Sequence, residues 1–373
     1  MRSRGPAPAT TTTCETATLR LNTRAPVLAL LAGLALPLAG CAAHLGSNSG
    51  EPLAPDSILV CDRAYEPTFV DLVDSARERI DIVQWELLDG VATDEIIEVL
   101  GAAADRGLAI RVLLDEEISD NHTGVDRLLA RGVNAKLDNN ASVRVHAKMV
   151  VADGEQTLLG STNWSTASID YNHECNVKLK NSGSASYLVA WIDQLWKDSS
   201  LRQPPALEQS NDARHRALVN DGLLSHLLEH IEAASESIDF TMYATYLQPS
   251  DPSAPAMQVF AALASAASRG VLVRGVADWS DWNPGNNESN QDAVNWLETR
   301  GVDMRWEQPD VLTHAKAFRI DDGLQIQTAN VSSGGLAYNH EAGAWVTETS
   351  VREDFQQWFD ALWADSQDTP PAR

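Results

Sequence analysis

The sequence predicts an α/β protein of two similar halves, each a mixed β-sheet flanked by helices. Three observations predict this fold class. Apolar residues alternate between helical and strand-like spacing along most of the chain, which is typical of an α/β architecture. Short motifs recur once each, and the two copies of one of them lie 167 positions apart. A Pro- and polar-rich segment, 201–216, stands between the copies and is the expected linker.

The repeat rests on four motifs that each half contains once. A repeat of this length predicts two copies of one structural unit, which we place at 57–200 and 217–368. The motif pairs are Arg106-Gly107 with Arg269-Gly270, Arg131-Gly132-Val133 with Arg300-Gly301-Val302, His146-Ala147-Lys148 with His314-Ala315-Lys316, and Tyr171-Asn172-His173-Glu174 with Tyr338-Asn339-His340-Glu341.

The elements of the first half follow from their hydrophobic spacing. Strands are expected where apolar residues run together or alternate, and helices where they recur every three or four positions. In chain order we expect a strand at Ile58–Cys61, a helix through Phe69, Leu72, Val73 and Ala76, a strand at Ile80–Leu87, a helix at Glu95–Ala104, a buried strand at Ala109–Asp115, a short helix at Asp126–Arg131, strands at Val143–Ala152 and Cys175–Leu179, and a closing helix at Tyr187–Lys197. The second half repeats this order and ends in a helix near Phe355–Trp363.

The N-terminal segment has the pattern of an export signal. Arg20 and Arg24 precede the apolar run Val27–Leu38, which is too short to cross a bilayer as a helix. We therefore expect a signal peptide at 1–40. Leu38-Ala39-Gly40-Cys41 resembles the lipobox of bacterial lipoproteins, which implies acylation of Cys41 and a lipid anchor at the cell envelope. An ordinary secretory signal is the alternative. Residues 41–56, rich in Gly, Ser, Asn and Pro, form the expected flexible tether.

The charge of the chain argues against a nucleic-acid partner. The formal net charge is −24 over 373 residues. Nucleic-acid affinity comes largely from Lys and Arg that neutralise phosphates, so an acidic surface repels such chains. A nuclease is disfavoured without being excluded, because a small basic pocket can lie inside an acidic shell. We further expect a monomer.

One of the repeated motifs carries chemistry. In each copy a His and a Lys lie two positions apart in an apolar segment, so on a strand both side chains face the same way. A single match to H-x-K-x4-D is weak, but two matches at equivalent positions of a repeat are not expected by chance. The Asp has the opposite parity and stands at a turn, so we expect it to brace the fold. The residues are His146, Lys148 and Asp153 in the first half and His314, Lys316 and Asp321 in the second.

With these paired motifs the chain resembles the phospholipase D superfamily over nearly all of 56–365. Gly160-Ser161-Thr162-Asn163 is similar to the family's G-S-x-N, whereas the second copy reads Gln327-Thr328-Ala329-Asn330. The resemblance implies an active site at the interface of two pseudo-twofold-related halves. It implies His146 as nucleophile and His314 as general acid and base. It further implies these roles: Lys148 and Lys316 beside the phosphate, Glu174 and Glu341 holding the histidines, and Asn163, Asn330, Ser161 and Thr328 binding the substrate.

The chemistry of these residue types supports such a site. A neutral imidazole can attack phosphorus when its other nitrogen donates to a carboxylate. Ammonium and amide groups hold the charge of the diester, and a second imidazole protonates the leaving alkoxide. We expect no metal and no cofactor. The leading hypothesis is hydrolysis of glycerophospholipids at a membrane surface through a phosphohistidine.

Two other enzymatic functions use the same residues. One is phosphatidyl transfer to an alcohol, as in cardiolipin synthases, and the other is an extracellular phosphodiesterase nuclease. A non-catalytic binding module is disfavoured, because both motifs are complete. The acidic composition favours a phospholipid partner over nucleic acid.

Two features stay open at the level of sequence. Cys61 and Cys175 lie in separate predicted strands, and a disulfide is about as expected as two free thiols. The polar segment Asp278–Asn290 contains Trp279 and Trp282 and is expected to be a loop that rims a pocket or touches a lipid interface.

Overall fold

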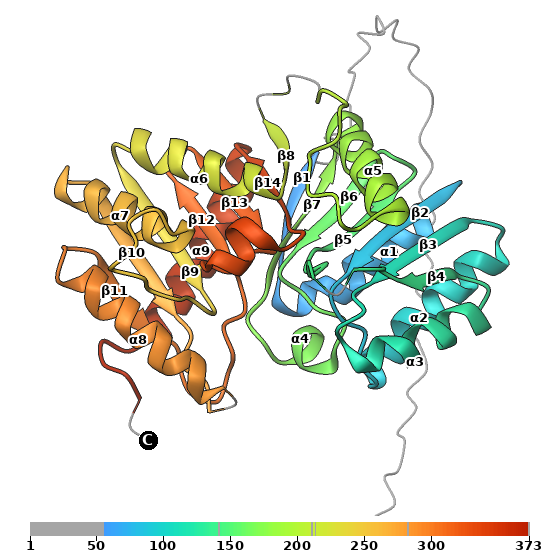
Figure 1. Ribbon diagram of the computed structural model, residues 1–373, viewed down its shortest axis with the longest axis horizontal. Coiled ribbons are helices and arrows are strands. Elements are labelled where there is room, and N and C mark those ends of the chain that lie inside the picture. Colours follow the sequence, from blue (N-terminus) through green and yellow to red (C-terminus); the bar gives the residue numbers. More distant parts are fainter. Residues whose placement is uncertain (1–55, 141, 210–211, 213, 282, 372–373) are drawn as a thin grey trace, which may run out of the picture. The chain divides into compact units, whose positions relative to one another are not determined.

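The computed structural model describes residues 56–371 apart from 141, 210–211, 213 and 282, and it contains two seven-stranded sheets. Each sheet mixes parallel and antiparallel pairs and is flanked by helices, which confirms the predicted fold class (Figure 1). The predicted signal peptide, Cys41 and nearly all of the tether lie outside the described residues. No helix in the described part of the chain is long and apolar enough to cross a membrane.

The two sheets have the same strand order when the second is written from its other edge. In each sheet, three strands that follow one another in sequence pair antiparallel, and three other strands pair in parallel through two crossover connections. The duplication therefore includes the strand topology. The first sheet runs β1 (Ser57–Cys61), β7 (Cys175–Lys180), β6 (Gln156–Gly160), β5 (Lys148–Ala152), β2 (Arg79–Gln84), β3 (Ala109–Leu114) and β4 (Asn134–Leu137). The second runs β8 (His215–Val219), β14 (Ala342–Val346), β13 (Gly323–Gln327), β12 (Ala317–Ile320), β9 (Ser237–Met242), β10 (Leu272–Ala277) and β11 (Asp303–Trp306).

The helices repeat in the same way. The first half has the 3-10 turn η1 (Asp62–Ala64), α1 (Tyr65–Ser75), α2 (Val91–Asp105), α3 (Ser119–Ala130), α4 (Thr166–Asp170) and α5 (Ser182–Lys197). The second half has α6 (Asp221–Ala233), α7 (Pro255–Ser268), α8 (Pro284–Glu298), the π-turn η2 (Gly334–Tyr338) and α9 (Thr349–Asp365). Each long helix buries one apolar stripe, as in α5, where Leu188, Trp191, Ile192 and Leu195 are buried at helical spacing.

Several predicted elements differ in extent from the structure, among them the strand predicted at Ile80–Leu87, which ends at Gln84. The strand expected at Val143–Ala152 begins only at Lys148, and the short helix expected at Asp126–Arg131 extends back to Ser119. The segment Asp278–Asn290 is not a loop throughout, because α8 begins at Pro284. Proline is favoured in the first turn of a helix, where its missing N–H is not needed.

The halves meet through a shared apolar core. Strands β6 and β7 contact β13 and β14, while α5 packs on β8 and α9 packs on β1. Trp191 of α5 and Phe359 of α9 are fully buried members of this one cluster. Each half therefore supplies a helix that covers the edge strand of the other. Burial of apolar surface on this scale fixes the two sheets as one unit.

Asp153 and Asp321 occupy equivalent turns at the ends of β5 and β12. Both have positive φ, 54° and 44°. The carboxylate of Asp153 accepts the backbone N–H groups of residues 77–79, and that of Asp321 accepts those of residues 235–237. These bonds lower the pKa of both carboxyls, although partial burial alone would raise it. Both side chains tie the turn to the start of β2 or β9, well separated from the histidines of the same motifs.

Candidate active site

The two halves enclose a cleft of about 470 Å³ whose lining contains residues of both. His146 and His314 both line it, so two histidines 168 positions apart in sequence face one space. Asn163 and Asn330 line the same cleft. The repeat thus brings equivalent side chains of both halves to a single site.

His146 is held by a carboxylate of the other half. Its Nδ1 lies 2.9 Å from Oε1 and 3.0 Å from Oε2 of Glu341. Thr328 and Asn339 donate to the two oxygens of Glu341, which is fully buried. Burial lowers the pKa of His146 to about 4. At neutral pH the ring is therefore uncharged, and a proton on Nδ1 leaves the lone pair on Nε2.

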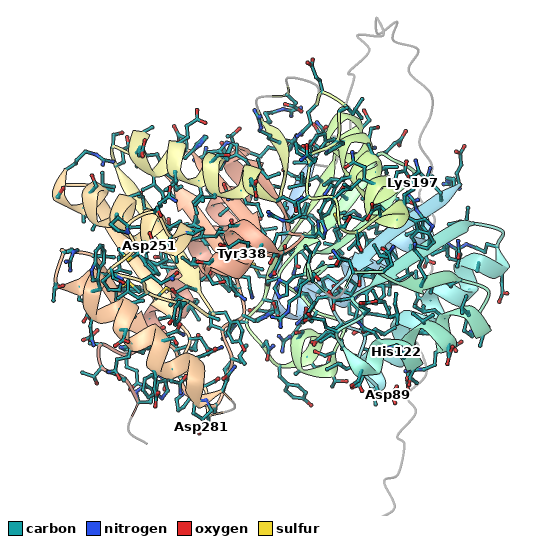
Figure 2. The ribbon with its side chains drawn as sticks, in the orientation of Figure 1. Asp89, His122, Lys197, Asp251, Asp281 and Tyr338 are labelled. Carbon is teal, nitrogen blue, oxygen red and sulfur yellow. The ribbon has the colours of Figure 1, made fainter. Side chains whose placement is uncertain are left out.

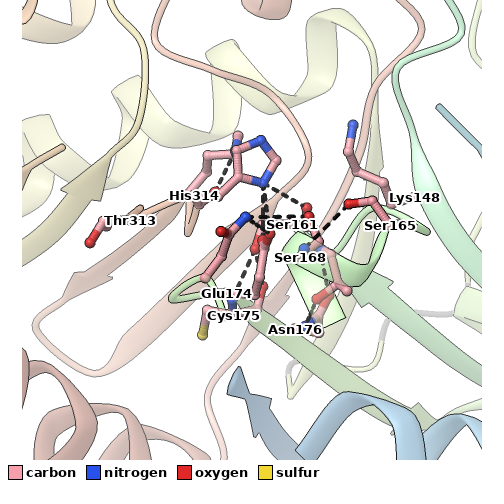
Figure 3. A network of polar contacts seen from close by, with 12 residues as sticks. Lys148, Ser161, Ser165, Ser168, Glu174, Cys175, Asn176, Thr313 and His314 are labelled. Atoms are coloured by element: carbon pink, nitrogen blue, oxygen red, sulfur yellow. Dashed lines mark hydrogen bonds and ion pairs between the residues drawn. The ribbon is translucent and has the colours of Figure 1, made fainter. Parts of the chain in front are cut away.

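His314 is held in the same way by the first half (Figure 3). Its Nδ1 lies 3.0 Å from both carboxylate oxygens of Glu174 and 3.1 Å from the carbonyl oxygen of Ser161. Burial lowers the pKa of His314 as well. Burial alone would raise the pKa of Glu174, but His314 and Lys316 outweigh it and the pKa is lowered. Glu174 is therefore an anion at neutral pH.

The crossed pairing is built by the backbone of the repeated Tyr-Asn-His-Glu segments. His340 accepts the N–H of His146 at 3.0 Å through its carbonyl oxygen, and His173 accepts that of His314 at 2.8 Å. Each segment forms an isolated parallel bridge beside the histidine of the other half. This bridge explains why β5 does not extend back to His146. The backbone ahead of the histidine pairs across the interface and not within its own sheet.

Ser161 and Thr328 lie behind the cleft. Both were predicted to bind substrate, and the structure places both fully buried and outside the lining of the cleft. Thr328 donates to Glu341 and accepts the N–H of Ala342 at 3.0 Å. Ser161 accepts the N–H of Cys175 at 2.9 Å, beside Glu174. The two hydroxyls therefore position the carboxylates and lie behind the reacting groups.

The different G-S-x-N sequence of the second half has a steric explanation. Gly160 opposes Asn176 in β7, and a Cβ on it would lie 2.4 Å from a backbone oxygen. In the second half the sizes are exchanged, because Gln327 opposes Gly343, where a Cβ would lie 2.8 Å from a backbone oxygen. Each pair holds one glycine, so Gln327 conserves the volume between the strands.

Lys148 and Lys316 lie buried directly behind the histidines. Each Nζ donates to the carbonyl oxygen of the histidine two residues earlier, at 2.6 Å for Lys148. Burial lowers the pKa of Lys148 to about 8 and that of Lys316 to about 7, although Glu174 and Glu341 oppose the shift. The positive charge of Lys148 contributes to the lowered pKa of Lys316, and neither lysine is among the residues that line the cleft.

Sequence reasoning did not assign the aromatic residues that flank the site. The ring centroid of Trp85 lies 5.1 Å from that of His146, and the centroid of Tyr243 lies 4.6 Å from that of His314. Both follow equivalent strands, β2 and β9, and both line the cleft. Of the two tryptophans in the segment Asp278–Asn290, Trp279 is buried and Trp282 lies outside the described residues.

Asn163 and Asn330 carry amide groups available to a substrate. The Oδ1 atoms of both are buried and have no hydrogen-bond partner in the described part of the chain. Oxygen and nitrogen of such an amide are assigned from hydrogen bonding, so either end can face a ligand. A pair of amides around one cleft suits the non-bridging oxygens of a phosphate.

Glu86 breaks the pseudo-twofold symmetry of the cleft. It lines the cleft, is half-buried and accepts a hydrogen bond from Asn163, whereas the equivalent position of the second half is Ala244. Burial raises the pKa of Glu86, and Lys148 opposes this rise. Asp89 also lines the cleft, and its carboxylate, at the surface of the molecule (Figure 2), is ion-paired with Arg127 at 2.7 Å. One side of the cleft is therefore acidic.

Two more pairs of polar residues support the site. Asp115 and Asp278 are buried at the ends of β3 and β10 and accept the N–H of the residue just before each histidine, at 2.6 and 2.9 Å. Asp62 and Asn220, both with positive φ, accept the N–H of Glu174 and Glu341. No role was predicted for the first pair, although its two residues follow equivalent strands. The second changes residue type between the halves, so no motif indicated it.

An apolar pocket of about 540 Å³ adjoins the cleft. The two share three lining residues, so they are neighbours on the surface. Tyr171, whose side chain is 70% exposed, stands at its edge. The lining residues are Ala167, Tyr171, Asn172, Asp310, Val311 and Leu312, of which Ala167, Asn172 and Leu312 also line the cleft.

The fold is shared with two solved structures over most of this chain, and a third solved structure matches part of it. Phosphatidylserine synthase of Haemophilus influenzae Rd KW20 matches with a TM-score of 0.68 at 11% identity, over 83% of this chain and 86% of that one. Polyphosphate kinase of Porphyromonas gingivalis matches with a TM-score of 0.61 at 15% identity, over 83% of this chain, which spans 47% of the kinase. The phospholipase D family member Nuc of Salmonella typhimurium matches over 42% of this chain and 99% of its own, at 20% identity and a TM-score of 0.36.

The sequence itself identifies the family. No curated protein matches the chain. The model of the family described as cardiolipin synthase, PLD-like domain, matches residues 69–196 and 227–363. One matched segment falls in each half and contains one His–Lys motif and one Tyr-Asn-His-Glu segment. Together they cover more than half of the sequence, and the chain therefore belongs to the cardiolipin synthase, PLD-like domain family.

Proposed function

We propose that the protein transfers phosphatidyl groups between alcohols, using a glycerophospholipid as donor and a phosphohistidine as intermediate. The observation that carries this proposal is the pair of crossed His–Glu dyads in one cleft, His146–Glu341 and His314–Glu174. A two-step displacement at phosphorus needs a nucleophile on one side and a proton donor on the other. Two dyads from opposite halves supply both.

His146 is the better nucleophile of the two. Its pKa, lowered to about 4 by burial, keeps it neutral at pH 7. His314 differs because its Nδ1 faces the Ser161 carbonyl in addition to Glu174. An extra acceptor favours the protonated ring, and the negative charge of a bound diester favours it further. His314 therefore suits the role of general acid.

In the first step Nε2 of His146 attacks phosphorus, and the bond from phosphorus to the head-group oxygen breaks. His314 gives its proton to the departing alkoxide. Lys148 and Lys316 balance the charge of the non-bridging oxygens, and the amides of Asn163 and Asn330 orient them. In the second step His314 takes the proton of an incoming hydroxyl, whose oxygen replaces the nitrogen of His146 on phosphorus.

The acceptor decides between transfer and hydrolysis. The matched family is described by cardiolipin synthase, which favours an alcohol as acceptor. Hydrolysis, the leading expectation from sequence, is the second candidate, because the cleft is open to solvent and water can replace the alcohol without any change of residue.

Two features of the cleft favour a lipid diester over a polynucleotide. The adjoining apolar pocket can receive part of an acyl chain, and Tyr171 and Val311 line it. The carboxyl groups of Glu86 and Asp89 line one side of the cleft, and where they are ionised they disfavour a polyanion. The net charge of −24 acts in the same direction.

Product analysis tests the proposal. The purified protein is incubated with phosphatidylglycerol vesicles, and with single-stranded DNA in parallel. Transfer to the glycerol hydroxyl of a second lipid yields cardiolipin and free glycerol, which we expect to dominate and to vanish in His146→Ala. Phosphatidic acid as the main product would establish hydrolysis. Cleavage of DNA alone would overturn the lipid assignment.

We also propose that the chain is exported and anchored through Cys41. The basic flank, apolar run and Leu-Ala-Gly-Cys sequence support this. Metabolic labelling with a radioactive fatty acid should mark the wild-type protein and not Cys41→Ser. Equal labelling of both proteins would contradict the anchor.

A further inference from the structure

Cys61 and Cys175 lie directly opposite each other in the antiparallel pair of β1 and β7. The N–H of Asp62 donates to the carbonyl oxygen of Glu174 at 2.9 Å. Asp62 follows Cys61 and Glu174 precedes Cys175, so these two residues form the next pair along the two strands. Hydrogen-bonded and non-hydrogen-bonded pairs alternate in an antiparallel sheet, and Cys61 and Cys175 are therefore a non-hydrogen-bonded pair. In such a pair the Cα atoms are only about 4.5 Å apart, within the range that a disulfide bridges.

The two sulfur atoms already face each other. The Sγ atoms lie 2.8 Å apart, and both side chains are free thiols in this structure. Cys175 is fully buried, whereas Cys61 is half-buried and can be reached by a reagent. Burial raises the pKa of the Cys61 thiol, and the neighbouring Cys175 raises it further.

The second half shows what this position needs when no bridge is formed. Val219 and Ala342 form the equivalent pair between β8 and β14. The flanking bond is the same, because the N–H of Asn220 donates to the carbonyl oxygen of Glu341 at 3.0 Å. An ordinary apolar pair is thus sufficient for packing, and packing alone does not account for two opposed thiols in the first half.

We propose that Cys61 and Cys175 form a disulfide that fastens the edge strand β1 beside the Glu174–His314 dyad. Two S–H bonds break and one S–S bond forms. The two electrons and two protons reduce an external disulfide, such as oxidised glutathione, to two thiols.

The disulfide is connected to the active site through the residues next to the two cysteines in sequence. Cys175 follows Glu174, and Cys61 precedes Asp62, whose carboxylate accepts the N–H of Glu174 at 3.0 Å. The same carboxylate accepts a hydrogen bond from Trp358 of α9 at 3.0 Å. In the described part of the chain β1 is an edge strand that pairs with β7, and its end is also held by Asn176, which donates to the carbonyl oxygen of Val60 at 3.1 Å. The disulfide therefore stabilises the link between β1, Glu174 and the second half.

The bridge closes a long loop, because the two cysteines lie 114 positions apart. Constraint of the unfolded chain by so long a loop stabilises a protein measurably, and for a domain of this size we expect a rise in Tm of about 5–10 °C. The full-length protein is equilibrated with oxidised or reduced glutathione, alkylated, digested and analysed by mass spectrometry, and its Tm is measured in both states.

The matched control is Cys61→Val/Cys175→Ala, which copies the pair of the second half. We expect a Cys61–Cys175 linked peptide and a higher Tm in the oxidised wild type, and no redox-dependent change of Tm in the control. Failure to find the linked peptide at any glutathione ratio would refute the bridge. A redox shift of equal size in the control would assign the effect to other cysteines. Neither readout depends on catalytic activity, so the outcome is independent of the proposed function.

Discussion

Replacement of Glu341 by Gln tests the crossed dyads most sharply. Three donors converge on the two carboxylate oxygens of Glu341, namely His146 Nδ1, Thr328 Oγ1 and Asn339 Nδ2. A glutamine offers only one oxygen, and its NH2 group must face one of these donors. Where it faces His146, the ring proton moves to Nε2, and the attacking lone pair is lost.

The expected loss follows from that change of tautomer. The corresponding carboxylate-to-amide exchange beside a catalytic histidine costs about 10⁴-fold in kcat in serine proteases. We expect a loss of about 10³- to 10⁴-fold for Glu341→Gln, or roughly 4–5 kcal/mol of transition-state stabilisation. Glu174→Gln is the matched control, because it makes the equivalent change next to His314.

The assay compares two leaving groups in the first step. Rapid-mixing kinetics measure release of an alkyl alcohol and of p-nitrophenol, which departs without a proton. Glu341→Gln should slow both, since it disables the nucleophile. Glu174→Gln should slow mainly the alkyl substrate, because His314 acts there as an acid. The opposite pattern, with Glu341→Gln rescued by p-nitrophenol, would refute the crossed assignment.

Three further predictions concern pH, stability and specificity. His146 must be neutral, and His314 and Lys316 must be protonated. A pH–rate profile of kcat/KM for the free enzyme should therefore rise as pH passes about 4 and fall as His314, whose pKa is lowered by burial, and Lys316, whose pKa is about 7, lose their protons. Activity that stays constant from neutral pH to pH 9 would contradict the roles of these two groups. Asp153→Gly removes the acceptor of three backbone N–H groups without straining the positive φ, and it should lower the unfolding free energy by about 1–3 kcal/mol in urea titrations with little change in kcat. Glu86→Gln removes a charge from one side of the cleft and should tighten binding of a single-stranded oligonucleotide by about three- to tenfold at low salt; unchanged affinity would show that Glu86 does not discriminate against polyanions.

Local sequence patterns predicted most of the fold. The repeat placed the same motifs in both halves, and the two sheets have the same strand order. The errors arose where tertiary contacts override local spacing. Val143–Ala152 has the apolar pattern of one strand, but the N–H of Val145 bonds Asp115 and that of His146 bonds His340, so strand pairing begins only at Lys148.

The pairing of the dyads was beyond sequence reasoning. Each glutamate follows a histidine of its own half by fewer than 30 positions, and nothing in that spacing indicates that it binds the other one. The role of Ser161 was also hidden, because a hydroxyl beside a catalytic motif can face the ligand or the carboxylate. No sequence pattern indicated Glu86. It stands out because the equivalent residue of the second half is Ala244 and because it lines the cleft that both halves form.

Trapping of the covalent intermediate tests the central claim most directly. His314→Asn is mixed with a p-nitrophenyl phosphodiester, whose leaving group needs no acid, and the protein is digested and analysed by mass spectrometry under alkaline conditions. The account predicts one equivalent of p-nitrophenol in a burst and an adduct in which phosphorus is bonded to a nitrogen of His146 and keeps its one remaining ester group, with neither seen in His146→Asn. An adduct on another residue, or steady turnover by His146→Asn, would contradict it.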